Sequence, residues 1–405
     1  MHFRRSLMLA SLVLWMALSL PSLAAPLSQE GEVHIVRAGE TLTQIALRYG
    51  VSVVELASTN ELADPDLILV GQRLLIPSTE PPQIRPGFHI VRAGETLSLI
   101  AKQYGVPVAD LIAANGLADP DLILVGQQLA IPQAQPALPA PFVKVRLSPN
   151  PAIQGQTLVI RVRTEGRLRV RGAILGQEFD FVTEASVGGE AWALVGVPVS
   201  TEPGRYELSL IAEGFESEAH LWLTVLAGDF GTDYIQFSPE DSRLLDPELL
   251  KEERAKLHRY WSHTRPSKLW RGSFRLPIAD DTPVSSPFGT RRSYNGQPAS
   301  SYHAGIDFAA LEGTPIYAPA AGRVVLAEEL TVRGGGVLID HGWGVISGYF
   351  HLSDIEVKAG ENVEGGDLIG RVGSTGLSTG NHLHWEIRVR GVPVDPRQWT
   401  QRATP

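Results

Sequence analysis

The 405-residue chain contains no cysteine, and this absence excludes several kinds of site. Without a thiol there is no disulfide, no thiolate metal ligand, no cysteine nucleophile and no N-terminal cysteine for lipid attachment. A cationic surplus is also missing, because 44 Asp and Glu outnumber 35 Lys and Arg and the formal net charge is −9. Nucleic acid is therefore not expected as the main partner, since phosphate binding needs a cationic surface. Any metal ion must be held by His, Asp or Glu.

Aromatic residues are sparse at 7%, whereas 40 glycines and 29 prolines indicate many turns and several linkers. The hydrophobic share of 43% and the charged share of 20% lie close to the averages of globular proteins, which excludes a wholly disordered or fibrous chain. At roughly 150 residues per domain, this length predicts two to four domains.

A long apolar run occurs in one place only, at the start of the chain. Two arginines, Arg4 and Arg5, precede the apolar residues Leu7–Leu20, and Ser22-Leu23-Ala24 fits a small-x-small cleavage site. This order is typical of a secretory signal peptide, here residues 1–24. The alternative is a short membrane anchor, but the run is shorter than the ~20 residues needed to span a bilayer. We expect an exported protein without a membrane span, secreted, periplasmic or associated with the cell wall.

Two segments, 33–77 and 88–132, repeat each other at an offset of 55, with 31 of the 45 aligned positions identical. Each copy predicts a strand, a Gly-Glu-Thr-Leu turn, a short helix capped by Thr41 or Thr96, a second short helix and a closing strand. In the first copy, apolar residues recur at helical spacing at Leu42, Ile45, Ala46 and Tyr49. The order β-α-α-β in about 45 residues predicts a very small domain.

The stretch HIVRAGETLTQIALRYGVSVVELASTN…LILVGQRLLIP resembles a LysM module, and both copies match along their length. The resemblance implies binding of glycans that contain N-acetylglucosamine, such as peptidoglycan, in a shallow groove between two loops. The residues implied for glycan contact are Gly39, Glu40, Thr41, Leu67 and Ile68 in the first copy, and Gly94, Glu95, Thr96, Leu122 and Ile123 in the second. The recurring His34 and His89 are assigned to hydrogen bonds at a strand edge rather than to a metal.

Residues 142–226 alternate apolar and polar side chains between turn signals, which predicts an antiparallel β-sandwich. The stretch Pro203–Leu208 resembles the late strands of immunoglobulin-like bacterial spacer domains, so we expect a spacer or a platform for a partner. A charged helix is predicted for 246–262, with Asp246 as N-cap and Pro247 in the first turn.

Five of the eleven histidines follow residue 300, in a strand-rich region. His303 and Asp307 are four residues apart, and His382 and His384 are two apart, so each pair would lie on one face of an extended strand. His303, Asp307 and His384 would form a two-His, one-carboxylate set. This is the ligand type of catalytic zinc, with a fourth position left for water.

The segments HAGIDFAALEGTPIYAPAAGRV and HGWGVISGYFHLSDIEVKAG…GNHLHWEIRV resemble the lysostaphin/LytM-type zinc metallopeptidases over residues 276–399. The resemblance implies a small antiparallel β domain of the duplicated hybrid motif type with one zinc ion, held by His303, Asp307 and His384. It implies catalytic roles for His351 and His382. We assign His351 as general base and His382 as transition-state stabiliser or proton donor, although these roles could be exchanged. His341, in an expected turn, is read as structural.

The sequence therefore predicts a multidomain, mainly β protein. Its expected function is hydrolysis of peptide bonds in peptidoglycan stem peptides or cross-bridges by a zinc-dependent endopeptidase, which the LysM modules bring to the glycan. An alternative is a non-catalytic scaffold that activates a partner, a cell-wall amidase. Intact ligand positions favour the enzyme.

Overall fold

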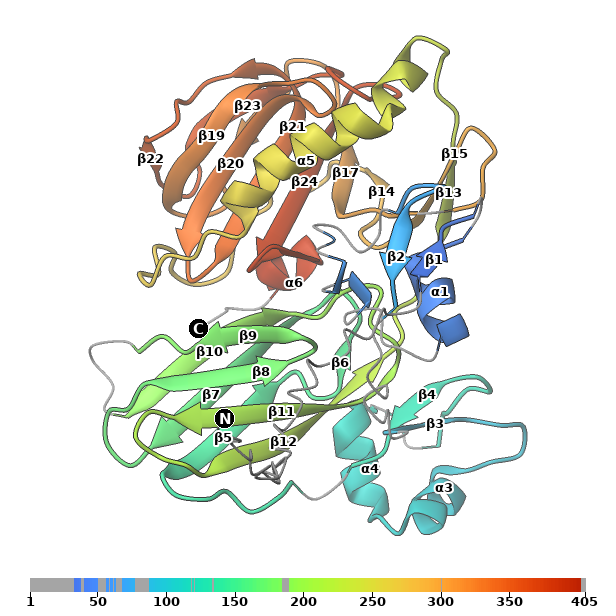
Figure 1. Cartoon of the computed structure of the whole chain (residues 1–405), viewed down its shortest axis with the longest axis vertical. Helices are drawn as coiled ribbons and strands as arrows, with labels where there is room; N and C mark the ends of the chain where they lie inside the picture. Colours follow the sequence, from blue (N-terminus) through green and yellow to red (C-terminus); the bar gives the residue numbers. More distant parts are fainter. Residues whose placement is uncertain are drawn as a thin grey trace, which may run out of the picture. The chain divides into compact units, whose positions relative to one another are not determined.

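The computed structural model is built mainly from β-strands (Figure 1). It describes residues 33–37, 40–49, 56–57, 59–60, 62, 68–76, 87–117, 119, 121–132, 135–183, 189–299 and 301–401. The predicted signal peptide, 1–24, lies outside these residues. Within the described ranges, no helix is long and apolar enough to cross a membrane.

The second repeat shows the predicted β-α-α-β order in full. Its elements are β3 (Phe88–Ile90), α3 (Leu97–Tyr104), α4 (Val108–Asn115) and β4 (Gln128–Ala130). Thr96 caps α3 by accepting a hydrogen bond from the Leu99 amide, and Gly105 ends the helix with a left-handed φ of 66°. The capping prediction for Thr96 is therefore confirmed.

The first repeat contains the antiparallel pair β1 (Val33–Ile35) and β2 (Arg73–Leu75), with α1 (Leu42–Tyr49) between them. Thr41 accepts a hydrogen bond from the Gln44 amide at 3.2 Å, as its predicted capping role requires. Most of the predicted second helix lies outside the described residues. Ile45 and Leu74 are fully buried, so even this small module has its own core.

The middle region, predicted as a sandwich, forms two sheets over one core. The three-stranded sheet has the order β10-β7-β5, with bounds Glu190–Gly196, Thr157–Thr164 and Phe142–Ser148. The five-stranded sheet has the order β6-β12-β11-β8-β9, with bounds Ala152–Ile153, Glu218–Leu226, Gly204–Ala212, Val170–Ile174 and Gln177–Asp180. Apolar side chains from both sheets share one buried cluster. Its relation to the immunoglobulin fold stays a prediction.

The segment after the sandwich holds one predicted and two unpredicted elements. The helix α5 (Pro247–Trp261) begins at Asp246, which accepts hydrogen bonds from the amides of Glu248 and Leu249. It follows the 3-10 helix η1 (Asp241–Leu245). The short strand β13 (Thr232–Ile235), which the sequence pattern did not indicate, pairs in parallel with β15 (Arg291–Tyr294). β13 therefore joins the C-terminal region through residues far along the chain.

A ten-stranded sheet dominates the C-terminal region. Its strands are β14 (Val284–Ser286), β17 (Gly305–Ala309), β18 (Pro315–Tyr317), β19 (Gly322–Leu330), β20 (Gly334–Gly342), β21 (Val345–Ile355), β22 (Asn362–Val363), β23 (Leu368–Val372), β24 (His382–Val389) and β25 (Val392–Val394). β16 (Ser301–Tyr302) pairs with β15, and α6 (Pro396–Gln401) ends the described chain. Among the described residues, the strand pairs of the large sheet are antiparallel, as predicted.

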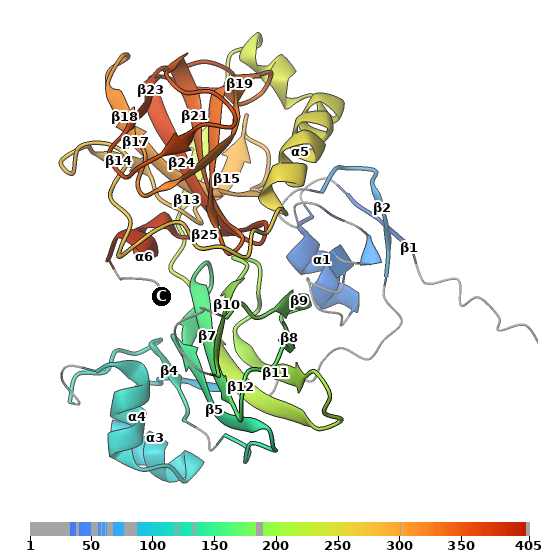
Figure 2. The same ribbon diagram turned by 90° about the vertical axis from the view of Figure 1, so that its left-hand side faces the viewer.

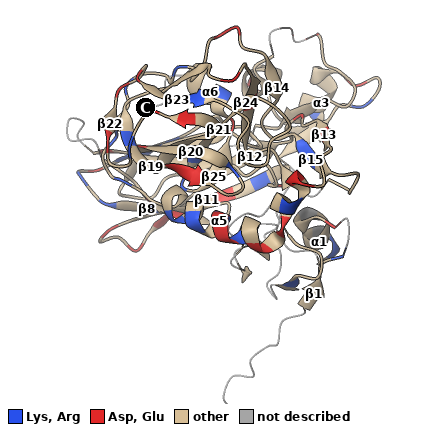
Figure 3. Cartoon of the chain, turned by 90° about the horizontal axis from the view of Figure 1, so that it is seen from above, with Lys and Arg blue, Asp and Glu red and all other residues tan. Residues whose placement is uncertain are grey.

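Helix α5 covers part of this sheet (Figure 2). Leu257 and Trp261 on its inner side are buried against Leu326, Leu338 and Phe350 of the sheet. Its outer side carries alternating acidic and basic residues (Figure 3). Apart from the buried Glu253, the charged residues of α5 thus lie on the solvent side of an amphipathic helix.

Candidate active site

Three predicted ligands meet where β17 pairs with β24. In this antiparallel pair Asp307 lies opposite His384 and Ala309 lies opposite His382. His303 lies outside β17, which begins at Gly305, so the expectation of one extended strand from 303 to 307 is wrong. The physical reason is distance, because residues four apart in a strand are separated by roughly 13 Å. The break before Gly305 lets His303 turn back toward Asp307.

The three side chains lie within contact distance of one another. Nε2 of His303 is 2.9 Å from Oδ1 of Asp307 and 2.9 Å from Nδ1 of His384. Nδ1 of His384 is 2.6 Å from the same Asp307 oxygen. In the part of the chain that the structure describes, this is the one group of three or more His, Cys, Asp or Glu whose ligand atoms converge in this way.

The outer hydrogen bonds of the two histidines decide which nitrogen carries a proton. Nδ1 of His303 lies 2.9 Å from the carbonyl oxygen of Pro287 and must donate to it, so Nε2 presents a lone pair. Nε2 of His384 lies 3.0 Å from Oε1 of Glu386 and donates there, which directs Nδ1 toward Asp307. Three electron-pair donors at such distances repel unless a cation or a proton lies among them. The set therefore fits a metal ion, and the acceptors behind the rings are those typical of metal-ligating histidines.

The protonation states of His303 and Asp307 at neutral pH agree with this reading. Burial lowers the pKa of His303 to about 4, and the neighbouring Asp307 compensates only in part. Burial raises the pKa of Asp307, but the attraction of His303 and His384 outweighs it and holds the value well below the ordinary range. A neutral imidazole and an ionised carboxylate are the forms that bind a metal.

Two further histidines flank the triad. The His351 ring centroid is 4.7 Å from that of His382 and 6.2 Å from that of His384. His351 lies in β21 with a φ of 65°, a left-handed conformation that is rare for a non-glycine residue and common at functional sites. Nδ1 of His351 donates to the Thr375 carbonyl at 2.8 Å, and Nδ1 of His382 donates to the Gly380 carbonyl at 2.8 Å. Both rings therefore keep a proton-free Nε2.

Burial keeps these two imidazoles neutral. It lowers the pKa of His351 to about 3, helped by the repulsion of His382 and His384. Burial also lowers the pKa of His382, against the attraction of Asp307. Nε2 of His382 lies 3.9 Å from Oδ1 of Asp307, so this ring adjoins the triad without replacing one of its members.

Residues that sequence reasoning missed hold the triad from behind. Arg292 donates from Nη2 to Oδ2 of Asp307 at 2.8 Å and to Oγ of Ser286 at 3.2 Å. Ser286 in turn donates to Oδ2 of Asp233 at 2.5 Å. Behind His384, the buried Glu386 also accepts a hydrogen bond from Nε of Arg388 at 2.8 Å. These partners come from four separate segments, so no local motif marks them.

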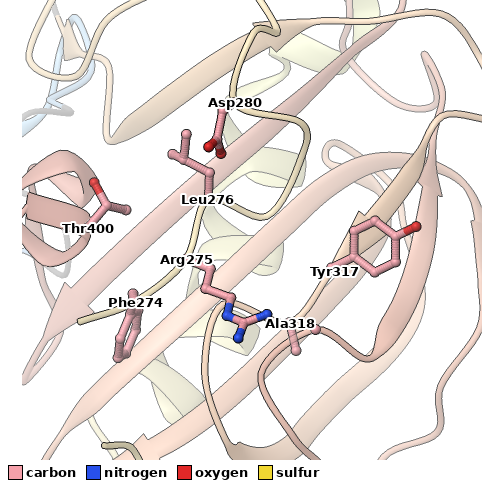
Figure 4. Close-up of a pocket in the computed structure, with 8 residues that line it drawn as sticks. Phe274, Arg275, Leu276, Asp280, Tyr317, Ala318 and Thr400 are labelled. Atoms are coloured by element: carbon pink, nitrogen blue, oxygen red, sulfur yellow. The ribbon is translucent and has the colours of Figure 1, made fainter. Parts of the chain in front are cut away.

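Four of the five residues open into a cleft of about 410 Å³. His351, His382, His384 and Asp307 line it, whereas His303 is 3% exposed and lies behind them. One side is formed by residues 377–382 and another by residues of the 233–237 segment. A larger hollow of about 650 Å³ lies elsewhere, between Phe274, Arg275, Tyr317 and Thr400, and no histidine lines it (Figure 4). The chemistry belongs to the smaller cleft.

His341 is separate from this cleft. It lies at the end of β20 rather than in the expected turn, and it is fully buried. Nδ1 is 2.8 Å from the Ala321 carbonyl, and Nε2 is 2.8 Å from Oγ of Ser347. Both nitrogens are engaged in the core.

Most of the described residues implied for glycan contact have structural roles within their module. Gly39 and Leu67 lie outside the described residues. Glu40 and Glu95 each accept hydrogen bonds from a histidine and a backbone amide of the same turn, so their carboxylates hold the loop. Thr41 and Thr96 cap helices, and Ile68 and Ile123 pack on the module cores. Leu122 is 65% exposed, and the neighbouring Leu124 and Val125, which were not predicted, are as open.

His34 and His89 contact side chains rather than a strand edge. His34 is buried, with Nδ1 3.0 Å from the Tyr49 hydroxyl and Nε2 2.7 Å from Glu40. His89 repeats this geometry with Tyr104 and Glu95. The expected edge hydrogen bond is therefore replaced by a buried link between the first strand, the turn and the helix.

Comparison with known proteins agrees with this geometry. The family described as "Peptidase family M23" matches residues 301–396, and the "LysM domain" matches residues 34–77 and 89–132. The chain carries an M23 metallopeptidase domain and two LysM domains. The resemblances to LysM modules and to the LytM-type metallopeptidases are thereby confirmed.

Among curated relatives of the M23 domain, "DD-carboxypeptidase/endopeptidase Mpg" of Neisseria meningitidis is 43% identical over 129 residues, which are 31% of this chain and 29% of Mpg. "Peptidoglycan DD-endopeptidase ShyA" of Vibrio cholerae is 40% identical over 148 residues, 36% of this chain and 34% of ShyA. The chain thus spans about a third of the length of these relatives. A solved structure of a putative M23 peptidase from Pseudomonas aeruginosa is 31% identical, with a TM-score of 0.45. The match covers 62% of this chain and 95% of the Pseudomonas chain.

Proposed function

We propose that the chain is a zinc-dependent endopeptidase that hydrolyses peptide bonds in peptidoglycan stem peptides or cross-bridges. The observation that carries the proposal is the convergence of His303, Asp307 and His384, with His351 and His382 presenting proton-free nitrogens to the same cleft. The name of ShyA, a peptidoglycan DD-endopeptidase, supplies the substrate class. The scaffold alternative is weaker, because a scaffold needs neither the ligand set nor the two flanking bases.

The zinc ion would be held by Nε2 of His303, Oδ1 of Asp307 and Nδ1 of His384. In such a site zinc acidifies water toward neutral pH and polarises a carbonyl group. Arg292 keeps the second oxygen of Asp307 engaged, which leaves Oδ1 for the metal. Glu386 fixes the orientation of the His384 ring.

The flanking histidines would move the protons. Nε2 of His351 accepts a proton from the attacking water, because its Nδ1 proton is committed to the Thr375 carbonyl. Nε2 of His382, whose ring adjoins that of His351, would take up this proton and then donate a hydrogen bond to the developing oxyanion or pass the proton to the leaving amine. His351 and His382 both carry their proton on Nδ1, so the structure, like the sequence, allows the two roles to be exchanged.

We further propose the domain division 33–77 and 88–132 for glycan binding, 142–226 as a spacer or platform, 246–262 as a linker helix and 276–399 for catalysis. Two glycan-binding modules on one chain raise the local concentration of the peptidase on a repetitive polymer. After removal of residues 1–24, the protein would act in the periplasm or at the cell wall.

Digestion of purified sacculi tests this function. Residues 26–405 should release fragments with new stem-peptide ends, identified by mass spectrometry. A chelator and the His384→Ala variant should each abolish release, and added zinc should restore only the chelated wild type. Release that occurs only when an amidase is added, with cuts between glycan and peptide, would instead establish the activator scaffold.

A further inference from the structure

The segment between the sandwich and α5 forms one side of the candidate cleft, although it lies outside the residues that match family M23. We call residues 232–237 the β13 wall. Asp233, Tyr234, Ile235 and Phe237 of this wall line the same cleft as His351, His382 and His384. The family match begins at residue 301, so the wall lies before the residues that the match covers.

The β13 wall is fixed to the catalytic region at both of its ends. Before it, Phe230 packs edge-to-face on Phe288 at 6.5 Å, and a Cβ placed on Gly289 would come within 2.3 Å of the Phe230 ring. After it, Phe237 stacks on Tyr294 at 5.8 Å with an angle of 26° between the ring planes. Between these anchors, the backbone of β13 pairs with β15 over four residues. These contacts hold the β13 wall in a fixed position beside the cleft.

The same wall is linked to the proposed metal ligands. Oδ2 of Asp233 accepts a hydrogen bond from Oγ of Ser286, which lies 3.1 Å from Nδ1 of His303. Arg292, which holds Asp307, donates to the same serine. The position of β13 is therefore set relative to the reacting centre by hydrogen bonds as well as by packing.

Tyr234 projects from this fixed wall with 78% of its surface exposed. An aromatic ring that is open beside a cleft offers apolar area for a ligand in the cleft to bury. The other cleft-lining residues of the wall, Asp233, Ile235 and Phe237, are only partly exposed, and the side chains of Asp233 and Phe237 have partners within the protein. Of these four residues, Tyr234 is the one whose side chain is largely open to solvent.

We propose that Tyr234 is a substrate-binding residue, which packs on the peptide next to the scissile bond and makes the β13 wall a determinant of specificity. This inference rests on the proposed endopeptidase function. The ligand is the peptide part of peptidoglycan rather than its glycan, because the wall adjoins the histidines that would act on a peptide bond.

The test uses residues 26–405 loaded with zinc and a soluble cross-linked peptide dimer that carries no sugar. kcat and KM are measured for the wild type, Tyr234→Ala, Tyr234→Phe and Tyr317→Ala. Tyr317 is the matched control, since it is a partly exposed tyrosine on β18 that lines the other hollow. Zinc content and circular dichroism are compared in all four proteins.

Tyr234→Ala should raise KM about tenfold and leave kcat within about twofold, the loss expected for one aromatic contact. Tyr234→Phe should restore most of the affinity, and Tyr317→Ala should match the wild type. Equal KM values for wild type and Tyr234→Ala would overturn the inference. So would a defect confined to intact sacculi, because that would assign the ring to the glycan. A wild type that cleaves no peptide would refute the endopeptidase function instead, which separates the two failures.

Discussion

At the scale of single residues, His341 shows how burial converts a titratable group into a pH-sensitive part of the core. Burial lowers its pKa from 6.5 to about 4, although the Ala321 carbonyl and Asp340 favour the charged form. The unfolded chain therefore binds a proton at His341 between these two values and the folded chain does not. Stability is fully present above pH 6.5 and falls as the pH drops toward 4.

When the pH falls from 7.5 to 5, the shifted pKa of His341 should lower the unfolding free energy of the wild type by about 2 kcal/mol, given a folded pKa of about 4. His341→Gln should remove that part of the pH dependence even if it lowers stability at both values. His303 and His351 contribute equally to both proteins and cancel in the comparison. Urea unfolding with the metal chelated measures the slopes, and His258→Gln on the solvent side of α5 is the control. Parallel pH profiles for wild type and His341→Gln would contradict the assignment.

Some residues of the candidate site could be predicted from the sequence, and others could not. The triad and its two flanking histidines stand in short motifs whose residue types are chemically specific, so their positions could be predicted. Asp233, Ser286 and Arg292 could not, because they meet only through the pairing of β13 with β15 and of β14 with β17. Roles such as the orientation of Asp307 by Arg292 depend on tertiary contacts that local patterns do not contain.

At the scale of elements, α5 could be predicted because its start is coded locally by Asp246 and Pro247. The strand β13 could not, since four residues without clear alternation pair with a partner about 60 positions later. Helix α5 also carries a buried acid, Glu253, which accepts hydrogen bonds from the amides of Val332 at 2.6 Å and Arg333 at 3.1 Å. The helix thereby satisfies backbone donors in the loop between β19 and β20.

Replacing Glu253 with alanine should leave these two amides without their acceptor. A buried donor left unsatisfied costs about 1–3 kcal/mol, so we expect Glu253→Ala to lower the unfolding free energy of the C-terminal region by about 3 kcal/mol. Chemical unfolding followed by tryptophan fluorescence measures the change. Glu252→Ala, the exposed neighbour on the same helix, should have little effect. If the two variants unfold alike, α5 does not stabilise the sheet through this carboxylate.

At the scale of the whole molecule, the sandwich is joined to the catalytic region by buried contacts rather than by a linker alone. Nε1 of Trp399 donates to Oγ1 of Thr157 at 3.0 Å, and Gln398 exchanges two hydrogen bonds with the Thr157 backbone. Leu194 and Val199 of the sandwich belong to the same buried cluster as the catalytic sheet. Residues 142–226, expected to be a spacer or a platform for a partner, therefore also pack directly on the catalytic region.

Truncation separates these contributions. Residues 135–405, which lack both LysM domains, should cleave the soluble peptide dimer at rates close to those of residues 26–405 but pellet poorly with sacculi. Residues 270–405 should lose thermal stability and peptide cleavage together, because they lack the β13 wall, α5 and the side chains that cover Trp399. Melting temperature, zinc content and kcat/KM are measured for all three. A fully stable and active 270–405 fragment would show that the catalytic sheet needs neither the sandwich nor the wall, whereas retained pelleting by 135–405 would remove the LysM domains from targeting.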